Sequence, residues 1–401
     1  RRAVALRITH LSFSSAGGAG TVARRLAEIQ NSVGHSARVS SVITGSLRSQ
    51  PLRSPKHTVA AAIDDYVIRT RSFNAPISLM RGDVHESLAQ EFRNSDVLHI
   101  HWPHGVLDLQ ALNRSFGGAI VWTLHDMRPF TGACHYSLGC QRFTAGCQSC
   151  PAVRSVWSER VSTQFAAQQK ALSELGKRLH FVSPSQWLAD TAKQSQMLRK
   201  AQVSVIPNPL PLNPPPAIDS DTLWQDIPGH ATVFVTAAAN IDDPVKDIGS
   251  AVASFIDAVG ENEDVWLLVA GSGKTRHPGH ARVRFLGGLG QQEMAALLSR
   301  ADYLLVTSLA ENQPLLISEA QSHGVCIIVR DSTGLSEHTL IDPHALRFTT
   351  GEDLAGLLQR VKDTPLTEKR RRAVSRSAWR RFNPQMIAQQ YLELYSDQLA
   401  Q

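Results

Sequence analysis

The sequence SLAENQPLLISEA, from Ser308 to Ala320, directly follows a short apolar run at residues 303–306. This order predicts a buried strand, a loop and then a helix, which is the repeating unit of an α/β fold. Pro314 suits the first turn of the helix because its missing N–H would have no partner there. The free backbone N–H groups of Leu315 and Leu316 then face the loop and favour an anion.

Two glutamates flank this anion site, Glu311 before the predicted helix and Glu319 on it, and Asn312 lies in the same loop. A carboxylate repels phosphate but accepts hydrogen bonds from hydroxyl groups. One surface that offers both kinds of contact indicates a ligand with both kinds of group. The sequence therefore predicts that a sugar nucleotide binds here.

Length and composition indicate a globular protein with two or more domains. The chain has 401 residues, of which 42% are hydrophobic, and each half is long enough to bury its own core. No apolar run approaches the roughly 18–20 residues that cross a membrane. Residues Arg1 to Leu6 lead into a strand pattern without the apolar core of a signal peptide, so we expect a cytoplasmic protein.

The net charge of +6 comes with basic clusters at residues 24–25, 69–71 and 369–381. These clusters fit either solvated helix faces or contact with an anionic membrane surface or lipid phosphate. The second reading predicts a protein peripheral to the inner face of the membrane. Nucleic acid is not an expected partner, because the basic runs lack interleaved aromatic residues and familiar binding motifs.

A proline-rich segment from Pro207 to Pro216 divides the chain, since so many prolines sustain neither a helix nor a central strand. Short apolar runs alternate with amphipathic segments on both sides of it. This alternation predicts two doubly wound parallel sheets, whose ligands bind at the carboxyl ends of the strands. The predicted strands are 3–9, 38–43, 96–101, 119–124, 179–183 and 203–206 before this segment, and 232–237, 265–270, 283–286, 302–306 and 325–329 after it.

Glycines follow the first predicted strand, which we expect to end near His10. Gly17 and Gly18 precede a helix that we expect from Thr21. Glycines let the backbone approach a ligand closely at a helix N-terminus, although a plain tight turn explains them equally well.

Lys246 lies in a loop just before a predicted helix at residues 248–259. A lysine at this point can neutralise a leaving pyrophosphate, or it can be an exposed residue at a helix start. Gly271 begins a second glycine-containing turn, Gly-Ser-Gly, after the predicted strand at 265–270.

His125 and Asp126 directly follow the predicted strand at 119–124. A histidine at the carboxyl end of a parallel strand is well placed to meet a ligand, and Asp126 is expected to orient the loop. The segment Asp219-Ser220-Asp221 spells a D-x-D metal motif, but it lies in the proline-rich connector and is read as a chance match.

Four of the five cysteines, Cys134, Cys140, Cys147 and Cys150, form one cluster. Because a cytoplasmic protein keeps its thiols reduced, the cluster predicts one structural zinc ion, with His135 as a possible replacement for one thiolate. Two disulfides and four free thiols are the alternatives. The surrounding segment 131–151 has few apolar residues, so a metal would supply the stability that burial does not.

The glutamate pair, its Asn-x-Pro insert and the trailing Gly324 resemble the motif of retaining glycosyltransferases of family 4, which have the GT-B fold. The segment from His125 to His135 resembles the H-D-x-x-P-x-T-G-x-C-H segment of a subset of this family. The resemblance covers most of the chain and is strongest over 119–151 and 282–338.

The resemblance implies two Rossmann-like doubly wound domains that face each other across a cleft. An acceptor domain, 1–206, would include the cysteine-rich loop 131–151, and a linker, 207–221, would lead to a donor domain, 222–383. A final helix in 384–401 would cross back to the first domain.

The resemblance also implies roles for individual residues. His125, Glu311 and Lys246 would be catalytic, and Glu319 would hold the ribose. The donor would also meet Gly17, Gly18, Lys246, Gly271, Asn312, Leu315 and Leu316.

Two departures from the family pattern affect the expected function. The arginine that the family places before Lys246 is missing near Asn240, and Thr333 stands where a Gly-Gly-x-x-Glu loop has its first glycine. The main reading is a retaining, metal-independent hexosyltransferase that moves a sugar from a UDP or GDP donor to a glycan or lipid-linked glycan. The alternative is a non-catalytic member of the same fold that binds a nucleotide sugar or polyanion, while an epimerase lacks support from the glutamate pair.

Overall fold

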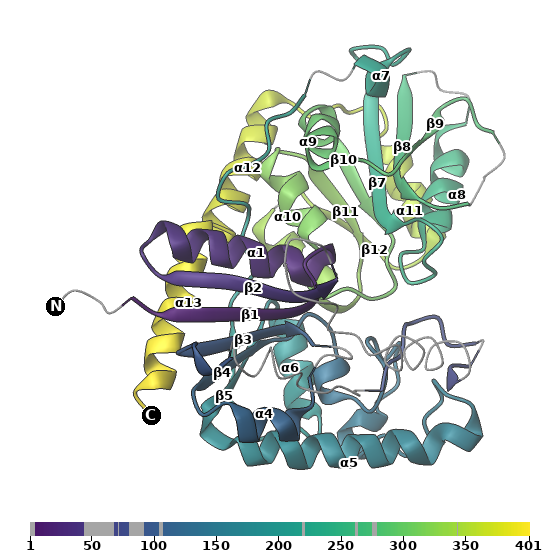
Figure 1. The fold of residues 1–401 in the computed structure, drawn as a ribbon. Helices are drawn as coiled ribbons and strands as arrows, with labels where there is room; N and C mark the ends of the chain where they lie inside the picture. Colours follow the sequence, from purple (N-terminus) through teal and green to yellow (C-terminus); the bar gives the residue numbers. More distant parts are fainter. Residues whose placement is uncertain are drawn as a thin grey trace. The chain divides into compact units, whose positions relative to one another are not determined.

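The chain forms two compact units in a computed structural model that describes residues 5–43, 68–70, 72–79, 92–103, 107–218, 221–260, 264–274, 279–342 and 344–401. The first unit comprises Arg1–Leu212 and Pro384–Gln401, and the second comprises Asn213–Asn383. The change from the first unit to the second falls inside the proline-rich segment. Each unit is a parallel sheet with helices along it (Figure 1).

The first sheet has six parallel strands in the order β2-β1-β3-β4-β5-β6. The chain therefore runs outward from β1 to β2 and then crosses to β3 on the other side of β1. This reversal of direction is the switch point of a doubly wound fold. The strands are β1 (Arg7–Ser14), β2 (Ser36–Ile43), β3 (Val97–Trp102), β4 (Ala119–Thr123), β5 (Leu179–Ser183) and β6 (Val203–Val205).

The second sheet repeats the plan in the order β12-β11-β10-β7-β8-β9, and its switch point lies between β7 and β10. The GT-B expectation of two doubly wound parallel sheets is confirmed. The strands are β7 (Thr232–Asn240), β8 (Val265–Ser272), β9 (Val283–Gly287), β10 (Tyr303–Val306), β11 (Cys326–Arg330) and β12 (Leu346–Phe348).

Helices connect these strands on both sides of each sheet (Figure 1). Those of the first unit are α1 (Gly17–Ser32), α4 (Leu109–Ser115), α5 (Ser158–Leu175), α6 (Gln186–Gln194) and α13 (Pro384–Leu399). Those of the second are α7 (Asp221–Trp224), α8 (Ile248–Val259), α9 (Gln291–Arg300), α10 (Leu315–Ser322), α11 (Gly351–Val361) and α12 (Glu368–Arg381). Short 3-10 turns include η3 (Arg142–Ala145), η5 (Gly176–Arg178) and η6 (Thr333–Ile341).

The core of the second unit explains why its strands are uninterrupted apolar runs. Alternate residues of one strand enter different clusters, with Val233 and Val235 in one and Phe234 in the other. Successive side chains of a strand point to opposite faces, so both faces of this sheet are buried. The central strands of such a sheet bury most of their side chains and leave functional groups to the loops at the strand ends.

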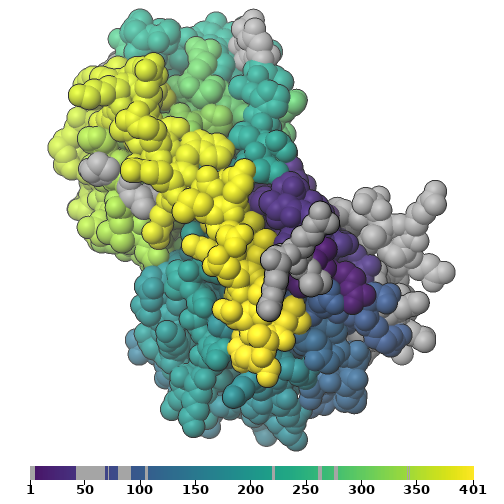
Figure 2. Space-filling view, turned by 90° about the vertical axis from the view of Figure 1, so that its left-hand side faces the viewer, coloured from purple at the N-terminus to yellow at the C-terminus, as the bar shows by residue number. Residues whose placement is uncertain are grey.

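The C-terminal helix α13 belongs to the first unit and packs on α1 and β4. Its residues, in yellow, lie beside the purple N-terminal part of the chain in Figure 2. Tyr391 and Tyr395 of α13 are fully buried against the first sheet, which places two hydroxyl groups inside the core.

Some element bounds differ from the sequence expectations. Strand β1 continues past His10 to Ser14, and α1 begins at Gly17 rather than Thr21, because a buried parallel strand extends as far as its neighbours pair with it. Strand β12 has only three residues and escaped the apolar pattern. The D-x-D segment falls partly on residues 219–220, which lie outside the described residues.

Candidate active site

The second sheet brings Lys246 and Glu311 together at its switch point. Lys246 follows β7 and Glu311 follows β10, and these two strands are neighbours. Loops after such a pair diverge and leave a crevice at the carboxyl ends of the strands. Hydrogen bonds join the two loops. Leu309 N–H donates to the Val245 carbonyl at 2.8 Å, and the Thr307 hydroxyl donates to the carbonyls of Lys246 and Asp247 at 3.1 and 2.8 Å.

Lys246 and Glu311 form an ion pair in which Nζ donates to the Glu311 carboxylate. The Lys246 side chain is 32% exposed and that of Glu311 only 9%. A buried carboxylate needs a partner, and Lys246 supplies it. A ligand diphosphate would offer Lys246 a second anion, which fits a lysine that neutralises a leaving group.

The backbone of Glu311 is fixed by the loop at Thr333 and Gly334. Its N–H donates to Thr333 Oγ1 at 2.9 Å, and its carbonyl accepts from Gly334 N–H at 2.9 Å and from Thr333 Oγ1 at 2.7 Å. A Cβ on Gly334 would lie 2.0 Å from the Asn312 carbonyl oxygen, so only glycine fits. Thr333 adopts the left-handed φ of 51° that usually favours glycine, and its hydroxyl adds a hydrogen bond that glycine cannot make.

Helix α10 begins where the sequence predicted, with Pro314 as its N-cap. Among the described residues, no hydrogen-bond acceptor meets the N–H groups of Leu315 and Leu316, as expected at a helix start that is open to an anion. Glu319 lies one turn further along and is half-buried. These groups all lie on the loop and helix that directly follow Glu311.

Gly271 lies at the carboxyl end of β8 with a φ of 140°, and a Cβ there would lie 1.9 Å from the Ala238 carbonyl oxygen. This close approach explains the glycine without a ligand. Asn240 accepts from the backbone N–H of Asp242, whose carboxylate accepts from Lys274 N–H at 2.7 Å. Asn240 therefore shapes the turn before Lys246 and carries no charge to replace the missing family arginine.

One cation near this turn was not predicted from the sequence. Arg330, at the end of β11, donates to Asp247 at 2.7 Å and to the Thr307 carbonyl at 2.8 Å. Asp247 directly follows Lys246 and caps α8 with a left-handed φ of 50°. Arg330 thus fixes the turn that carries Lys246, and only the pairing of β10 with β11 brings it there.

In the first unit, His125 and Asp126 follow β4, as the sequence indicated. Asp126 accepts hydrogen bonds from Trp102 Nε1 at 2.9 Å, from Arg128 N–H at 2.8 Å and from His135 Nδ1 at 2.6 Å. It therefore orients the loop. His135 also meets Ser78 Oγ through its Nε2 at 3.0 Å, so a metal ion at that nitrogen would have to displace Ser78.

Packing within the chain does not require the first two glycines of α1, so their predicted place beside a ligand stays a prediction. Gly17 has a φ of 75°, but a Cβ on Gly17 or Gly18 would meet no atom within 4 Å. Gly20 is the glycine that close packing requires, because its Cβ would lie 2.3 Å from the Ser14 carbonyl oxygen.

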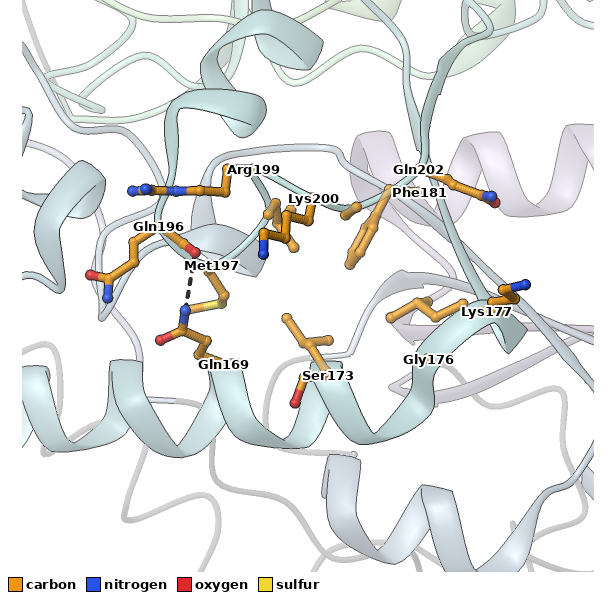
Figure 3. Close-up of a pocket in the computed structure, with 14 residues that line it drawn as sticks. Gln169, Ser173, Gly176, Lys177, Phe181, Gln196, Met197, Arg199, Lys200 and Gln202 are labelled. Atoms are coloured by element: carbon orange, nitrogen blue, oxygen red, sulfur yellow. Dashed lines mark hydrogen bonds between the residues drawn. The ribbon is translucent and has the colours of Figure 1, made fainter.

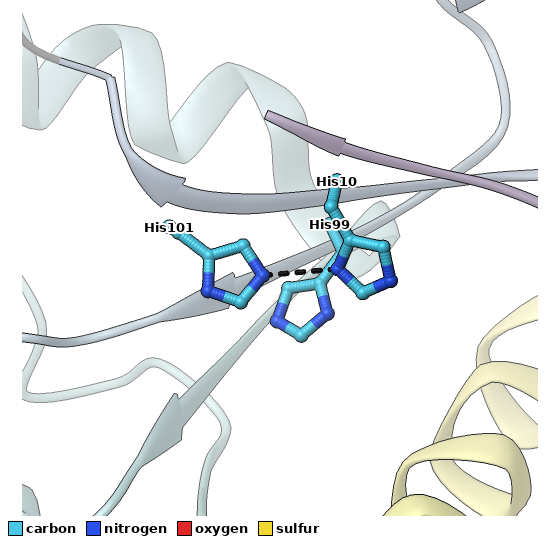
Figure 4. Close-up of side chains that lie close together, drawn as sticks. All are labelled: His10, His99 and His101. Atoms are coloured by element: carbon cyan, nitrogen blue, oxygen red, sulfur yellow. Dashed lines mark hydrogen bonds between the residues drawn. The ribbon is translucent and has the colours of Figure 1, made fainter. Parts of the chain in front are cut away.

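A cluster of three buried histidines lies next to His125 and was not predicted from the sequence. It consists of His10, His99 and His101. His10 of β1 pairs in register with His99 of β3, and ring centroids are 4.2–5.3 Å apart. Figure 4 shows the rings projecting from the two strands, with His10 bonded to His101. The signal was His-x-His within a buried strand, since residues two apart share a face.

Burial keeps these histidines neutral. It lowers the pKa of His10 to about 4 and holds the pKa values of His99 and His101 well below the usual range. The pKa of His125 is also lowered by burial, to about 4, although Asp126 opposes the shift. All four rings are therefore uncharged at neutral pH.

We expect the protein to lose stability as the pH falls from about 6.5 to about 4. The unfolded chain binds protons below about 6.5, whereas the folded His10 does not until about 4, so unfolding is favoured by acid in this window. His10 alone would contribute up to about 3 kcal/mol above pH 6.5. Urea unfolding at pH 7.5, 6 and 5 measures it, and a free energy of unfolding that stays constant would contradict the buried neutral cluster.

No disulfide joins the four clustered cysteines as the structure places them, and burial raises the pKa of the Cys147 thiol to about 11 and that of the Cys150 thiol above its usual range. Among the described residues, the group of potential ligands that all lie within 4.8 Å of one another is His10, His99 and His101. No three of these thiols meet that distance, so as placed they do not form a tetrahedral zinc site.

The expectation that segment 131–151 buries little is wrong at Phe143. This residue in η3 is 5% exposed and packs edge-on against Phe130, with ring centroids 6.0 Å apart. The segment therefore buries an aromatic side chain against the residue that directly precedes it.

A hollow of about 700 Å³ lies elsewhere on the first unit, between the end of α5 and the segment that follows α6. Leu172, Phe181 and Met197 line it, and Lys177 and Lys200 lie at its margin (Figure 3). It opens near the start of β5, at the opposite end of the sheet from His125, so we assign it no part in the chemistry.

Comparisons with known proteins agree with this geometry. Residues 16–213 match the family description "Glycosyltransferase Family 4", and residues 232–362 match "Glycosyl transferases group 1". A protein of Escherichia coli described as a colanic acid biosynthesis glycosyl transferase, WcaC, is 24% identical over 75% of this chain and 76% of its own. An MMP alpha-(1->4)-mannosyltransferase of Mycolicibacterium hassiacum is 27% identical over 54% of this chain and 56% of its own.

Solved structures share the fold. Sucrose-phosphate synthase of Thermosynechococcus elongatus has a TM-score of 0.65 at 16% identity, with 98% of this chain and 99% of that chain covered. HepE of Anabaena, in complex with UDP-glucose, has a TM-score of 0.62 at 17% identity, with 98% and 100% covered. The chain belongs to the glycosyltransferases of the GT-B fold. Among its described helices, none is long and apolar enough to span a membrane.

Proposed function

We propose that this protein is a retaining glycosyltransferase that moves a hexose-type sugar from a UDP or GDP donor to a glycan or lipid-linked glycan of a cell-surface polysaccharide. The observation that carries the proposal is the ion pair of Lys246 and Glu311 at the switch point, beside the open N-terminus of α10. The names of the relatives, a colanic acid transferase and a mannosyltransferase, support a polysaccharide-type acceptor and a hexose. HepE binds UDP-glucose, which supports a nucleotide-sugar donor.

In this proposal the second unit stabilises the leaving diphosphate without a metal ion. Lys246 and the N–H groups of Leu315 and Leu316 bind the phosphate oxygens as negative charge builds on them. Glu319 accepts hydrogen bonds from the ribose hydroxyls. Glu311 acts at the transferred sugar, whose ring carbon gains positive charge as the diphosphate leaves.

His125 also acts at the sugar, close to the reacting carbon. The acceptor hydroxyl attacks from the side of the departing diphosphate, which takes its proton, so the configuration at the sugar carbon is retained. This path needs electrostatic support and no separate general base.

Lys246→Ala should weaken nucleoside diphosphate binding by about 1–3 kcal/mol, the scale of a charge-assisted hydrogen bond. Calorimetry or thermal shift with UDP, GDP and ADP measures it. Lys369→Ala, which removes an exposed lysine of α12 in the same unit, is the control and should bind as wild type does. A melting temperature unmoved by all three nucleotides at millimolar concentration would reject the donor site.

We also propose that Cys134, Cys140, Cys147 and Cys150 bind one structural zinc ion. A tetrahedral zinc site needs Zn–S distances of about 2.3 Å and thiolates, so the sulfur atoms would have to move closer and lose their protons. Their clustering along one loop after His125 supports this proposal.

Elemental analysis of protein purified without added metal should find about one zinc per chain. Cys147→Ser should lower the zinc content and the melting temperature, whereas Cys326→Ser, in the core of the second unit, should leave the zinc content unchanged. Zinc-free protein in which a thiol reagent modifies all four cysteines would contradict the proposal, and zinc-free protein without free thiols would indicate disulfides.

A further inference from the structure

A continuous chain of hydrogen bonds runs from His125 into the core of the first unit and ends on α13. His125 Nε2 meets His101 Nδ1 at 3.0 Å, and His101 Nε2 meets His10 Nδ1 at 3.0 Å. His10 Nε2 meets Gln30 Oε1 at 2.8 Å, and Gln30 Nε2 donates to the Tyr395 hydroxyl at 3.3 Å. Five side chains from β1, α1, β3, α13 and the loop after β4 thus form one series.

Gln30 gives this series a direction, because its carbonyl only accepts and its amide nitrogen only donates. With the amide nitrogen on Tyr395, the carbonyl must accept a proton from Nε2 of His10. A neutral imidazole has one N–H, so Nδ1 of His10 is an acceptor, and His101 must donate to it. Because His101 donates from Nε2, its Nδ1 is an acceptor, and His125 must donate to it from Nε2. Nδ1 of His125 therefore keeps its lone pair.

A second branch agrees with this direction. The Tyr395 hydroxyl accepts from Gln30 and is then free to donate to His99 Nδ1, 2.6 Å away. His99 Nε2–H then donates to Thr123 Oγ1 at 2.7 Å, and Thr123 donates to the Tyr391 hydroxyl at 3.1 Å. Each group in the branch has one assigned donor and one assigned acceptor.

The surroundings isolate the series from water. His10, His99, Gln30 and Tyr395 are all 0% exposed, and His101 is 1% exposed. All ring nitrogens of His10, His99 and His101 have hydrogen-bond partners, so a metal ion would have to replace bonds that the core already makes. Among the described residues, no hydrogen bond reaches Nδ1 of His125, which is half-buried.

We infer that Gln30, with its amide nitrogen on the Tyr395 hydroxyl, is a positioning residue that sets the tautomers of His10, His101 and His125. As a result, His125 presents the lone pair of Nδ1 and accepts a hydrogen bond from a hydroxyl of the transferred sugar. The inference rests on the proposed function for the identity of that hydroxyl, whereas the tautomers rest on the orientation of the Gln30 amide in the structure. The reverse order of protons requires the Gln30 amide to be turned over, and it would make His125 Nδ1 a donor.

Nitrogen-15 NMR of the histidine side chains in the full-length protein at pH 7.5 tests the tautomers directly. His10, His101 and His125 should each carry the proton on Nε2. Protonated Nδ1 on these rings, or shifts typical of a bound metal, would overturn the inference.

Two variants interrupt the series of hydrogen bonds at Gln30 and Tyr395, the end opposite His125. Gln30→Met keeps the side-chain volume and removes both hydrogen-bonding atoms, and Tyr395→Phe keeps the ring and removes the hydroxyl that orients the amide. In both, His125 should change from the Nε2–H tautomer to a mixture of two. Tyr391→Phe, one turn earlier on α13 and at the end of the other branch, is the control and should leave the His125 signal unchanged.

Kinetics separates positioning from structural damage. Gln30→Met should lower kcat about two- to tenfold, the loss of one hydrogen bond, with the Kd for the free nucleoside diphosphate unchanged. An unchanged kcat, or an equal loss of nucleotide affinity, would overturn the inference. If no donor is turned over by the wild type, the proposed function fails, while the spectrum still decides the tautomers.

Discussion

Glu311→Gln should lower kcat by about a hundredfold or more, the scale reported for loss of one preorganised electrostatic group in an active site. The carboxylate is nearly buried and its backbone is bound on both sides by Thr333 and Gly334, so its charge is already in place when the reaction begins. The amide keeps the shape and removes the charge that the developing positive sugar carbon needs. Lys246 can still donate to the amide oxygen, but it loses its counter-charge.

The measurement is turnover of the preferred donor together with the affinity for the free nucleoside diphosphate. Affinity should change little, because Glu311 acts at the sugar rather than the nucleotide. Glu352→Gln, an exposed glutamate in the first turn of α11, is the matched control and should keep wild-type turnover. Equal losses of affinity and turnover in Glu311→Gln would contradict the division of roles between Glu311 and Glu319.

Gly334→Ala should damage the same site through the backbone. The added Cβ would lie 2.0 Å from the carbonyl oxygen of Asn312 and 2.8 Å from its carbonyl carbon, so the loop that carries Glu311 must move. We expect a loss of about 1–3 kcal/mol in the free energy of unfolding, as for other overpacked sites. Turnover should fall further than stability alone would require, since the loop positions Glu311 and the start of α10.

Urea unfolding and kcat of the folded variant measure the two effects. Gly229→Ala is the control, because an added Cβ there meets no atom within 4 Å and the residue needs no left-handed φ. A Gly334→Ala protein with wild-type stability and turnover would show that the contact with Asn312 is not needed.

Much of the second unit could be predicted because its short apolar runs are typical of strands buried on both faces of a parallel sheet. Strands such as Tyr303–Val306 are buried on both faces, and the loop–helix sequence after them carries the phosphate-binding pattern. Lys246 and Glu311 were predicted for one site through the family resemblance, since each lies in a loop after a predicted strand where the family has its donor-site residues. That they meet at the switch point depends on strand order, which only the structure supplies.

The parts that escaped prediction depend on contacts between distant segments. Arg330 reaches Asp247 across two strands, and Gln30 and Tyr395, which lie 365 residues apart, meet only when α13 packs on the first sheet. Strand β12 is too short for a pattern. Thr333 in place of glycine suggested a weakened loop, whereas its hydroxyl holds Glu311.

The most direct test of the proposed chemistry is hydrolysis of α-linked UDP and GDP sugars by the wild-type protein in EDTA, followed by proton NMR. We predict that nucleoside diphosphate appears together with the α-anomer of the free sugar, before mutarotation mixes the anomers. Glu311→Gln should suppress both signals. The β-anomer as first product, or activity that EDTA abolishes and Mg²⁺ restores, would contradict a retaining, metal-independent transferase. Donor binding without any release would indicate a non-catalytic protein.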